Sequence, residues 1–130
     1  MADWRNFRAF VKSSYEVTQE ETDMMQLIFA TEGDRTQVVY LWHWVLRKGT
    51  EDWLAIESPF AELQAVDLEK VVVEAGGLAC GGVVAVDDVL AVRHVLPLAN
   101  LDINEFKRPL ELVTSAADHL EQLLFGDDRF

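Results

Sequence analysis

Residues 36–46 read Thr-Gln-Val-Val-Tyr-Leu-Trp-His-Trp-Val-Leu, and they are the most unusual segment of the chain. Because successive side chains of a β-strand point to opposite faces, it divides into two sets. One face would carry Val38, Tyr40, Trp42, Trp44 and Leu46, and the other Val39, Leu41, His43 and Val45. β-Branched and aromatic residues favour a pleated surface. We therefore predict one long central strand that is apolar on both faces.

Two further strands are predicted beside it. Residues 24–31 are apolar enough for a strand, and the turn signal Gly33-Asp34 separates them from the central one. Residues 53–58 indicate a third strand, which Pro59 should end because its nitrogen has no proton to donate. The acidic cluster at residues 20–23 is expected to be a solvated loop. The three strands in succession predict an antiparallel meander.

Three helices are predicted around these strands. The first covers residues 3–14 with Asp3 as N-cap, and the second follows Asp67 and stops at Gly76-Gly77. The last begins at a capping box, Asp102 with Glu105, and should stop at Gly126. The expected buried stripes of the three helices are Trp4, Phe7, Phe10 and Val11; Leu68, Val71, Val72 and Ala75; and Ile103, Phe106, Leu110, Val113, Ala117, Leu120 and Leu124.

Two details of the second half complete the order of elements. Residues 82–86 and 89–96 predict a hairpin around Asp87-Asp88. Pro109 would either kink the last helix or open a helix that starts near Arg108. The order is then helix, three strands, helix, two strands, helix. We predict a single α+β domain over residues 1–130, with an antiparallel sheet and helices packed on it.

Composition excludes several classes of function. The chain has 130 residues, with 23 acidic and 11 basic side chains and a net charge of −12. This charge argues against binding to nucleic acid and to anionic membrane surfaces. Its one cysteine, Cys80, permits no internal disulfide, and no apolar run approaches the ~20 residues that span a bilayer. We expect a cytoplasmic protein.

No catalytic or metal-binding motif emerges from the sequence. The three histidines have no zinc spacing, and we expect no cofactor, no metal and no catalytic residue. His43 is interpreted as a hydrogen-bonded core or interface residue, with a metal ligand or base as the alternative. Cys80 is interpreted as a small buried hydrophobe. Asp118 and Glu121 share a helical face, interpreted as a solvated face rather than a pair of catalytic carboxylates.

The aromatic residues of the strands are the candidate binding site. Tyr40, Trp42 and Trp44 share one face of the central strand, and Trp53 would join them from the next strand. Core packing beneath helices is one interpretation. The other is an interface for a partner or a second copy, because so few helices cannot cover both apolar faces of the sheet.

The order of elements in an acidic chain of this size resembles the type III secretion chaperone-like superfamily, and within it the YbjN-type proteins. The residues that carry the resemblance are Trp53-Leu54-Ala55-Ile56-Glu57-Ser58, Leu101-Asp102-Ile103-Asn104-Glu105-Phe106, Ala117-Asp118-His119-Leu120-Glu121 and Gly126-Asp127-Asp128. The resemblance implies a non-enzymatic, chaperone-like module. Secretion chaperones of this superfamily are small acidic homodimers that hold an extended segment of a partner protein against apolar surface.

The expected function is therefore a cytoplasmic protein-interaction domain. It would form a homodimer and bind a peptide segment through apolar surface at Tyr40, Trp42, Trp44 and Trp53. The alternative is a small-molecule sensor or enzyme with a pocket between sheet and helices, in which His43 and Cys80 would be the functional groups.

Overall fold

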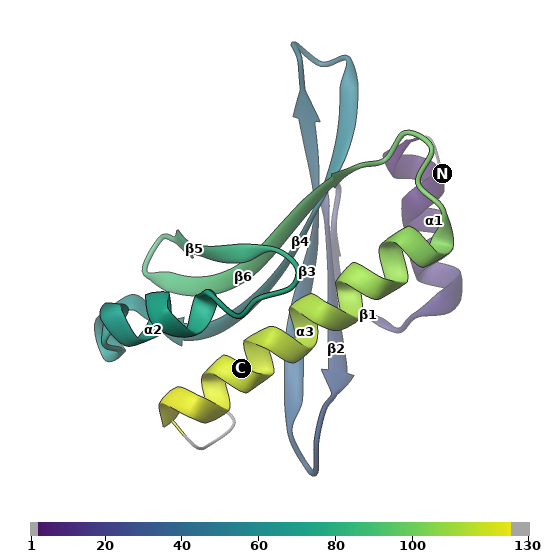
Figure 1. Ribbon diagram of the computed structural model, residues 1–130. Coiled ribbons are helices and arrows are strands. Elements are labelled where there is room, and N and C mark those ends of the chain that lie inside the picture. Colours follow the sequence, from purple (N-terminus) through teal and green to yellow (C-terminus); the bar gives the residue numbers. More distant parts are fainter. Residues whose placement is uncertain (1–2, 126–130) are drawn as a thin grey trace.

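A long β-strand, β3 (Thr36–Leu46), lies in the middle of an antiparallel sheet, over the range predicted for it. The computed structural model describes residues 3–125. Six strands follow the order β1-β2-β3-β4-β6-β5 (Figure 1). The other elements are α1 (Trp4–Ser14), β1 (Val17–Glu21), β2 (Met24–Ala30), β4 (Glu51–Glu62), a 3-10 turn (Leu63–Ala65), α2 (Leu68–Ala75), β5 (Gly82–Val86), β6 (Val89–Pro97) and α3 (Ile103–Phe125).

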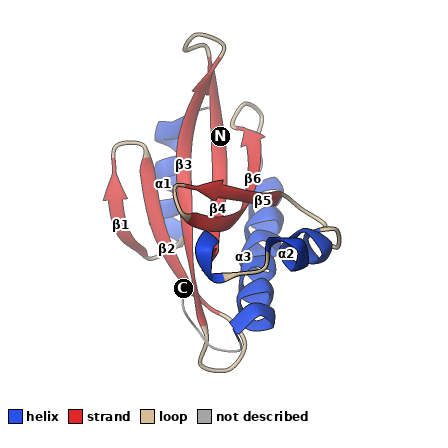
Figure 2. Cartoon of the chain, turned by 90° about the vertical axis from the view of Figure 1, so that its left-hand side faces the viewer, coloured by secondary structure: helices blue, strands red, loops and turns tan. Residues whose placement is uncertain are grey.

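Two helices, α1 and α3, cover one face of this sheet. Val39 and Leu41 of β3 are fully buried beneath them. The helices also contact each other, since the ring of Phe7 meets the ring of Phe106 edge-on at 4.9 Å between centroids. Figure 2 shows α1 behind the strands. The predicted class is confirmed: the fold is α+β, with an antiparallel sheet and helices packed on it.

Helix α3 follows its sequence signals closely. The amide of Glu105 donates to Asp102 Oδ1 at 2.8 Å, and the amide of Asp102 donates to Glu105 Oε1 at 3.1 Å, which is the predicted capping box. The helix continues through Pro109, so the alternative of a start near Arg108 is wrong. The stripe is buried from Phe106 to Leu120, whereas Ile103 is about half exposed. The predicted stop at Gly126 lies outside the described residues. Within residues 3–125, no helix is both apolar and long enough to cross a membrane.

The sheet has one strand more than predicted. Glu20 and Glu21 belong to β1 rather than to a loop, and only the next two residues form the turn into β2. β1 is an edge strand and, apart from Val17, which packs against the core, it carries only polar side chains. It is tied to α1, where Arg8 and Lys12 contact the Glu20 carboxylate at 2.9 and 3.3 Å. Its sequence has no apolar alternation and thus gave no strand signal.

Pro59 does not end its strand. β4 runs on to Glu62 and pairs with β6 on the far side of the proline. The Gln37 side-chain amide donates to the Pro59 carbonyl at 2.6 Å, so the backbone polar groups of Pro59 face β3. Backbone pairing between β3 and β4 ends at Tyr40 and Glu57. The missing N–H of the proline therefore falls where no ladder bond is needed.

The predicted stripe of α2 is mostly wrong. Val71 is buried, but Val72 is 69% exposed and Leu68 is 49% exposed. Ala75 is half-buried. The helix does begin at its predicted cap, with Asp67 Oδ1 accepting from the amide of Glu69 at 3.0 Å. These side chains are exposed because α2 lies beside β5, away from the central strands. Only a narrow line of the helix therefore contacts the sheet.

Asp118 and Glu121 are buried rather than solvated. Arg35, in the turn between β2 and β3, donates from Nε to Asp118 Oδ1 at 3.0 Å and from a terminal nitrogen to Glu121 Oε1 at 2.8 Å. The Glu121 side chain has no exposed surface. This ion cluster fastens the second half of α3 to the β2–β3 turn.

Replacing Arg35 should destabilise the protein strongly. We expect Arg35→Met to lower the free energy of unfolding by about 3 to 5 kcal/mol, because two carboxylates remain buried without their cation. Urea denaturation measures this change. The matched control is Arg108→Met, because the ion pair of Arg108 with Glu111 is exposed and should contribute less than about 1 kcal/mol. Equal losses in the two variants would contradict a structural role for the buried cluster.

Candidate functional site

The aromatic face is the side of the sheet opposite α1 and α3, and it holds all four predicted site residues. Trp44 lies directly across from Trp53, and Trp42 follows two residues before Trp44 along β3. Tyr40 follows on the same side. All four side chains are half-buried. The alternation in the sequence thus placed them correctly on one face, and they do not lie beneath the two covering helices.

The aromatic side chains are held by specific contacts. The rings of Tyr40 and Trp42 lie 6.2 Å apart between centroids, tilted by 33°. The guanidinium of Arg93, from β6, lies over the Trp44 ring at 4.9 Å from its centroid. Arg93 also donates from Nε to Glu57 Oε2 at 2.9 Å. The sequence did not identify Arg93, because only the pairing of β4 with β6 brings it to this face.

The surroundings of the four residues are mostly apolar. Strand register places further apolar side chains on the same face, Met24, Ile28, Val38, Leu46, Ala55 and Val95, together with the polar side chains of Gln26, Thr36, Glu51 and Glu57. Ile28 is 47% exposed and Leu46 is 39% exposed. Ala55 is fully buried although it lies on the face away from α1 and α3, so its larger neighbours cover it. The aromatic face is therefore a packed apolar surface with its outer side open.

The two edges of the sheet differ in chemistry. β1 ends in Glu20 and Glu21, whose charges oppose the approach of another strand. β5 reads Gly-Val-Val-Ala-Val and carries no charged side chain. Gly81 precedes it with φ +78°, and a Cβ there would come within 2.5 Å of the Arg93 carbonyl oxygen. Glycine thus permits the close approach that starts the β5–β6 pairing.

His43 lies on the helix-covered face, away from the aromatic face. Its Nδ1 is 2.9 Å from Asp23 Oδ1 and its Nε2 is 2.7 Å from Asp52 Oδ1. Its ring stacks on Trp4 of α1, 5.1 Å between centroids. The prediction of a hydrogen-bonded histidine is confirmed. Since both ring nitrogens are held by carboxylates, neither is available as a base or a metal ligand in this arrangement.

The two carboxylates also set the charge of His43. Burial, the largest single influence, lowers its pKa, but the hydrogen bonds and negative charges of Asp23 and Asp52 together outweigh burial and raise the pKa above the ordinary 6.5. The charged ring is therefore favoured in the folded protein. It links the β1–β2 turn, β3 and β4 beneath α1.

This linkage predicts a pH dependence of stability. The contribution of His43 is fully present below about pH 6.5 and disappears as the pH rises through the raised pKa of the folded state. Urea denaturation between pH 6 and 9 should show wild-type stability falling over this window. In His43→Gln the loss of stability over this pH range should be smaller than in the wild type. In the control His119→Gln, which alters an exposed histidine, the loss should equal that of the wild type. A wild-type fall retained in full by His43→Gln would contradict the assignment.

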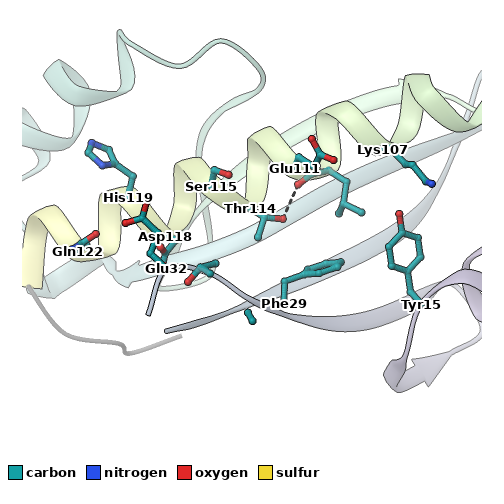
Figure 3. Close-up of a pocket in the computed structure, with 13 residues that line it drawn as sticks. Tyr15, Phe29, Glu32, Lys107, Glu111, Thr114, Ser115, Asp118, His119 and Gln122 are labelled. Carbon is teal, nitrogen blue, oxygen red and sulfur yellow. Dashed lines mark hydrogen bonds between the residues drawn. The ribbon is translucent and has the colours of Figure 1, made fainter. Parts of the chain in front are cut away.

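A groove of about 750 Å³ lies between β2 and α3, beside the sheet (Figure 3). Tyr15, Phe29 and residues 107–122 of α3 contribute to its lining. Burial and then the charge of Glu111 raise the pKa of Tyr15, so its hydroxyl keeps its proton. No local pattern in the sequence predicts this groove, because its walls come from segments far apart in the chain.

The groove does not contain the two groups that the alternative reading requires. Neither His43 nor Cys80 lines it. Cys80 lies between α2 and β5, and burial raises its pKa, which disfavours the reactive thiolate. Within residues 3–125, no group of three or more metal-ligating side chains comes together.

Comparison of the chain with protein-family models, with curated proteins and with solved structures found no match.

Proposed function

We propose that this chain is a non-enzymatic, chaperone-like interaction domain that binds an extended segment of a partner protein on the aromatic face. The observation that carries the proposal is the open outer side of Trp42, Trp44 and Trp53 on a sheet that is apolar on both faces. Large contiguous apolar surfaces on a protomer usually mark interaction sites. Tryptophan and tyrosine are also the residues enriched where binding energy concentrates.

Burial of apolar side chains would supply most of the affinity. Each Å² of apolar surface removed from water contributes roughly 25 cal/mol, so a partner that covers these rings gains several kcal/mol before the cost of ordering. The rings lose little freedom on binding because they already pack on one another and on Arg93. This pre-ordering favours tight binding.

Backbone pairing at β5, which lies two strands beyond β4 in the sheet, would form a second contact with another part of the partner segment. An exposed edge strand offers unpaired N–H and C=O groups to an extended segment, and β5 has no charged residue to oppose it. Residues 62–88, which include β5 and α2, hold six acidic side chains against one basic, a net of −5. We therefore propose a partner segment that is apolar in the middle and basic at its ends.

The proposal includes the family and the setting. The resemblance of residues 53–58 and 101–106 to the YbjN-type pattern supports a chaperone-like role and a homodimer. A single cysteine and a strongly acidic composition support a cytoplasmic location. The aromatic face would serve either the partner segment or the second protomer, and the following variants separate these uses.

Trp42→Ser should weaken binding without unfolding the protein. The probe is the peptide Lys-Lys-Val-Thr-Val-Thr-Val-Lys-Lys, titrated by calorimetry. We expect its affinity to fall about 30-fold, which corresponds to the 2 kcal/mol typical of a central aromatic contact. Light scattering after size-exclusion chromatography reports the oligomeric state of the same samples, and loss of a dimer would assign the face to the second protomer.

The control is Trp4→Ser, because Trp4 is 7% exposed and belongs to the core. Circular dichroism should show that Trp4→Ser loses its fold, since removal of a buried indole costs about 3 to 5 kcal/mol. If Trp42→Ser unfolds in the same way, Trp42 is a core residue and the proposed site is wrong. Unchanged binding by a folded Trp42→Ser would equally contradict it.

Charge placed on the β5 edge should block strand addition. Ala85→Lys gives β5 the protection that β1 already has, and Ala85 is exposed, so the fold should persist. Calorimetry should show about 10-fold weaker binding of the peptide to Ala85→Lys and no change in Gln19→Lys, the matched variant on β1. A peptide methylated at alternate backbone nitrogens should also bind more weakly. Equal binding of the methylated and unmethylated peptides would refute edge pairing while leaving the aromatic face in place.

A further inference from the structure

The large apolar side chains that are exposed gather in two places. Of the nine within residues 3–125, two lie at the end of β3 and four lie on α2 and at the end of β5. They are Val45 and Leu46 in the first place, and Leu68, Val72, Val73 and Val86 in the second. Figures 1 and 2 show that the end of β3 and α2 lie far apart on the protomer. The two apolar surfaces can therefore meet only between two copies of the chain.

The first surface belongs to the β3–β4 hairpin, which projects beyond its neighbouring strands as an arm. Pairing of β2 with β3 stops at Trp42, and pairing of β6 with β4 stops at Trp53. Residues 44–51, the hairpin arm, therefore have a paired strand on one side only (Figure 1). Val45 and Leu46 are adjacent in β3, so they lie on opposite faces of the arm. The arm thus presents exposed apolar surface on both faces.

The tip of the hairpin arm is basic. Arg47 Nε lies 3.5 Å from Glu51 Oε1, whereas Lys48 is exposed and makes no ion pair within residues 3–125. Lys48 is thus an uncompensated cation in a chain whose net charge is −12. Surface charges act over about 8 Å at physiological ionic strength, so a contact here requires a cation at the tip and not a fixed length of the turn.

The second surface, on α2, complements the hairpin arm in polarity and in charge. Residues four apart share a row along a helix, so Leu68 and Val72 form one row and Glu69 and Val73 the next. All four side chains are exposed, and Glu69 makes no ion pair within the described part of the chain. Residues 62–88 around them carry a net charge of −5. α2 therefore offers apolar surface with an uncompensated carboxylate within it.

We propose that the hairpin arm of one copy docks on α2 of a second copy and places Lys48 beside Glu69. The exposed apolar side chains of the two surfaces would then cover each other. Because the two surfaces differ, each docked pair keeps one free arm and one free α2, and association can continue head to tail. Pairing of α2 with α2 would instead bring together two regions of net charge −5, which repulsion opposes. The contact does not depend on the partner segment proposed above.

Complementing variants test the head-to-tail contact. Sedimentation velocity of the full chain should show association that grows with concentration. Val45→Ser removes apolar surface from the arm and Val72→Ser from α2, so each variant alone should associate about 10-fold more weakly. An equimolar mixture of the two keeps one intact arm and one intact α2, so it should form dimers and nothing larger. The control Ile103→Ser, which changes an exposed apolar residue of α3, should associate like the wild type. A wild type that stays monomeric, or undiminished association of a folded Val45→Ser, would overturn the proposal.

Reversed charges test the pairing of Lys48 with Glu69. Lys48→Glu and Glu69→Lys should each weaken association because each brings like charges together, and the double variant should restore it. Lys107→Glu, which changes an exposed lysine of α3, should leave association unchanged. Circular dichroism confirms the fold of each variant. A double variant that fails to recover would show that the two residues do not meet. Loss of association in Trp42→Ser but not in Val45→Ser would place the second copy on the aromatic face; either result overturns the proposal.

Discussion

Coverage of the sheet by helices is the constraint on which the rest of this structure depends. Six strands about 4.8 Å apart span roughly 24 Å, and two helices packed side by side cover about 20 Å. α1 and α3 are therefore enough for most of one face and none of the other. The groove beside β2 and the open aromatic face follow from this shortage, since each lies where the helical layer ends.

The side chains of the aromatic face pack against one another, and this packing limits their exposure to water. Ala55 and Glu57 are nearly inaccessible although they lie on the face opposite α1 and α3. The indole of Trp44 and the guanidinium of Arg93, which are in contact, lie on the same face as these two residues. Half-burial of the aromatic residues is thus compatible with a stable protomer and leaves their outer surfaces available. A core interpretation would require a covering element that α1 and α3 do not provide.

Local signals in the sequence predicted the fold well, and long-range contacts limited the prediction of the sites. β3 and the cap of α3 follow from alternation and from Asp102 with Glu105, which need no knowledge of partners. Arg35 and Asp118 are 83 residues apart, so nothing near Asp118 in the sequence indicates that it is buried. The prediction that Pro59 ends its strand was wrong for a similar reason. A proline interrupts a strand only where its nitrogen faces a pairing strand, and β3 has already stopped pairing with β4 at that point. The groove is a product of tertiary packing and had no local signature at all.

The side-chain period of β3 has a consequence for how this chain can change. Adding or removing one residue between Gln37 and His43 would exchange the two faces of the strand beyond that point. Indole rings would then be driven into the closely packed space beneath the two helices, while Val39 or Leu41 would turn toward solvent. The hairpin turn at residues 47–50 does not determine which face a β3 side chain occupies, so its length can vary. Insertions and deletions that persist in evolution should therefore occur at this turn and be rare within the strand.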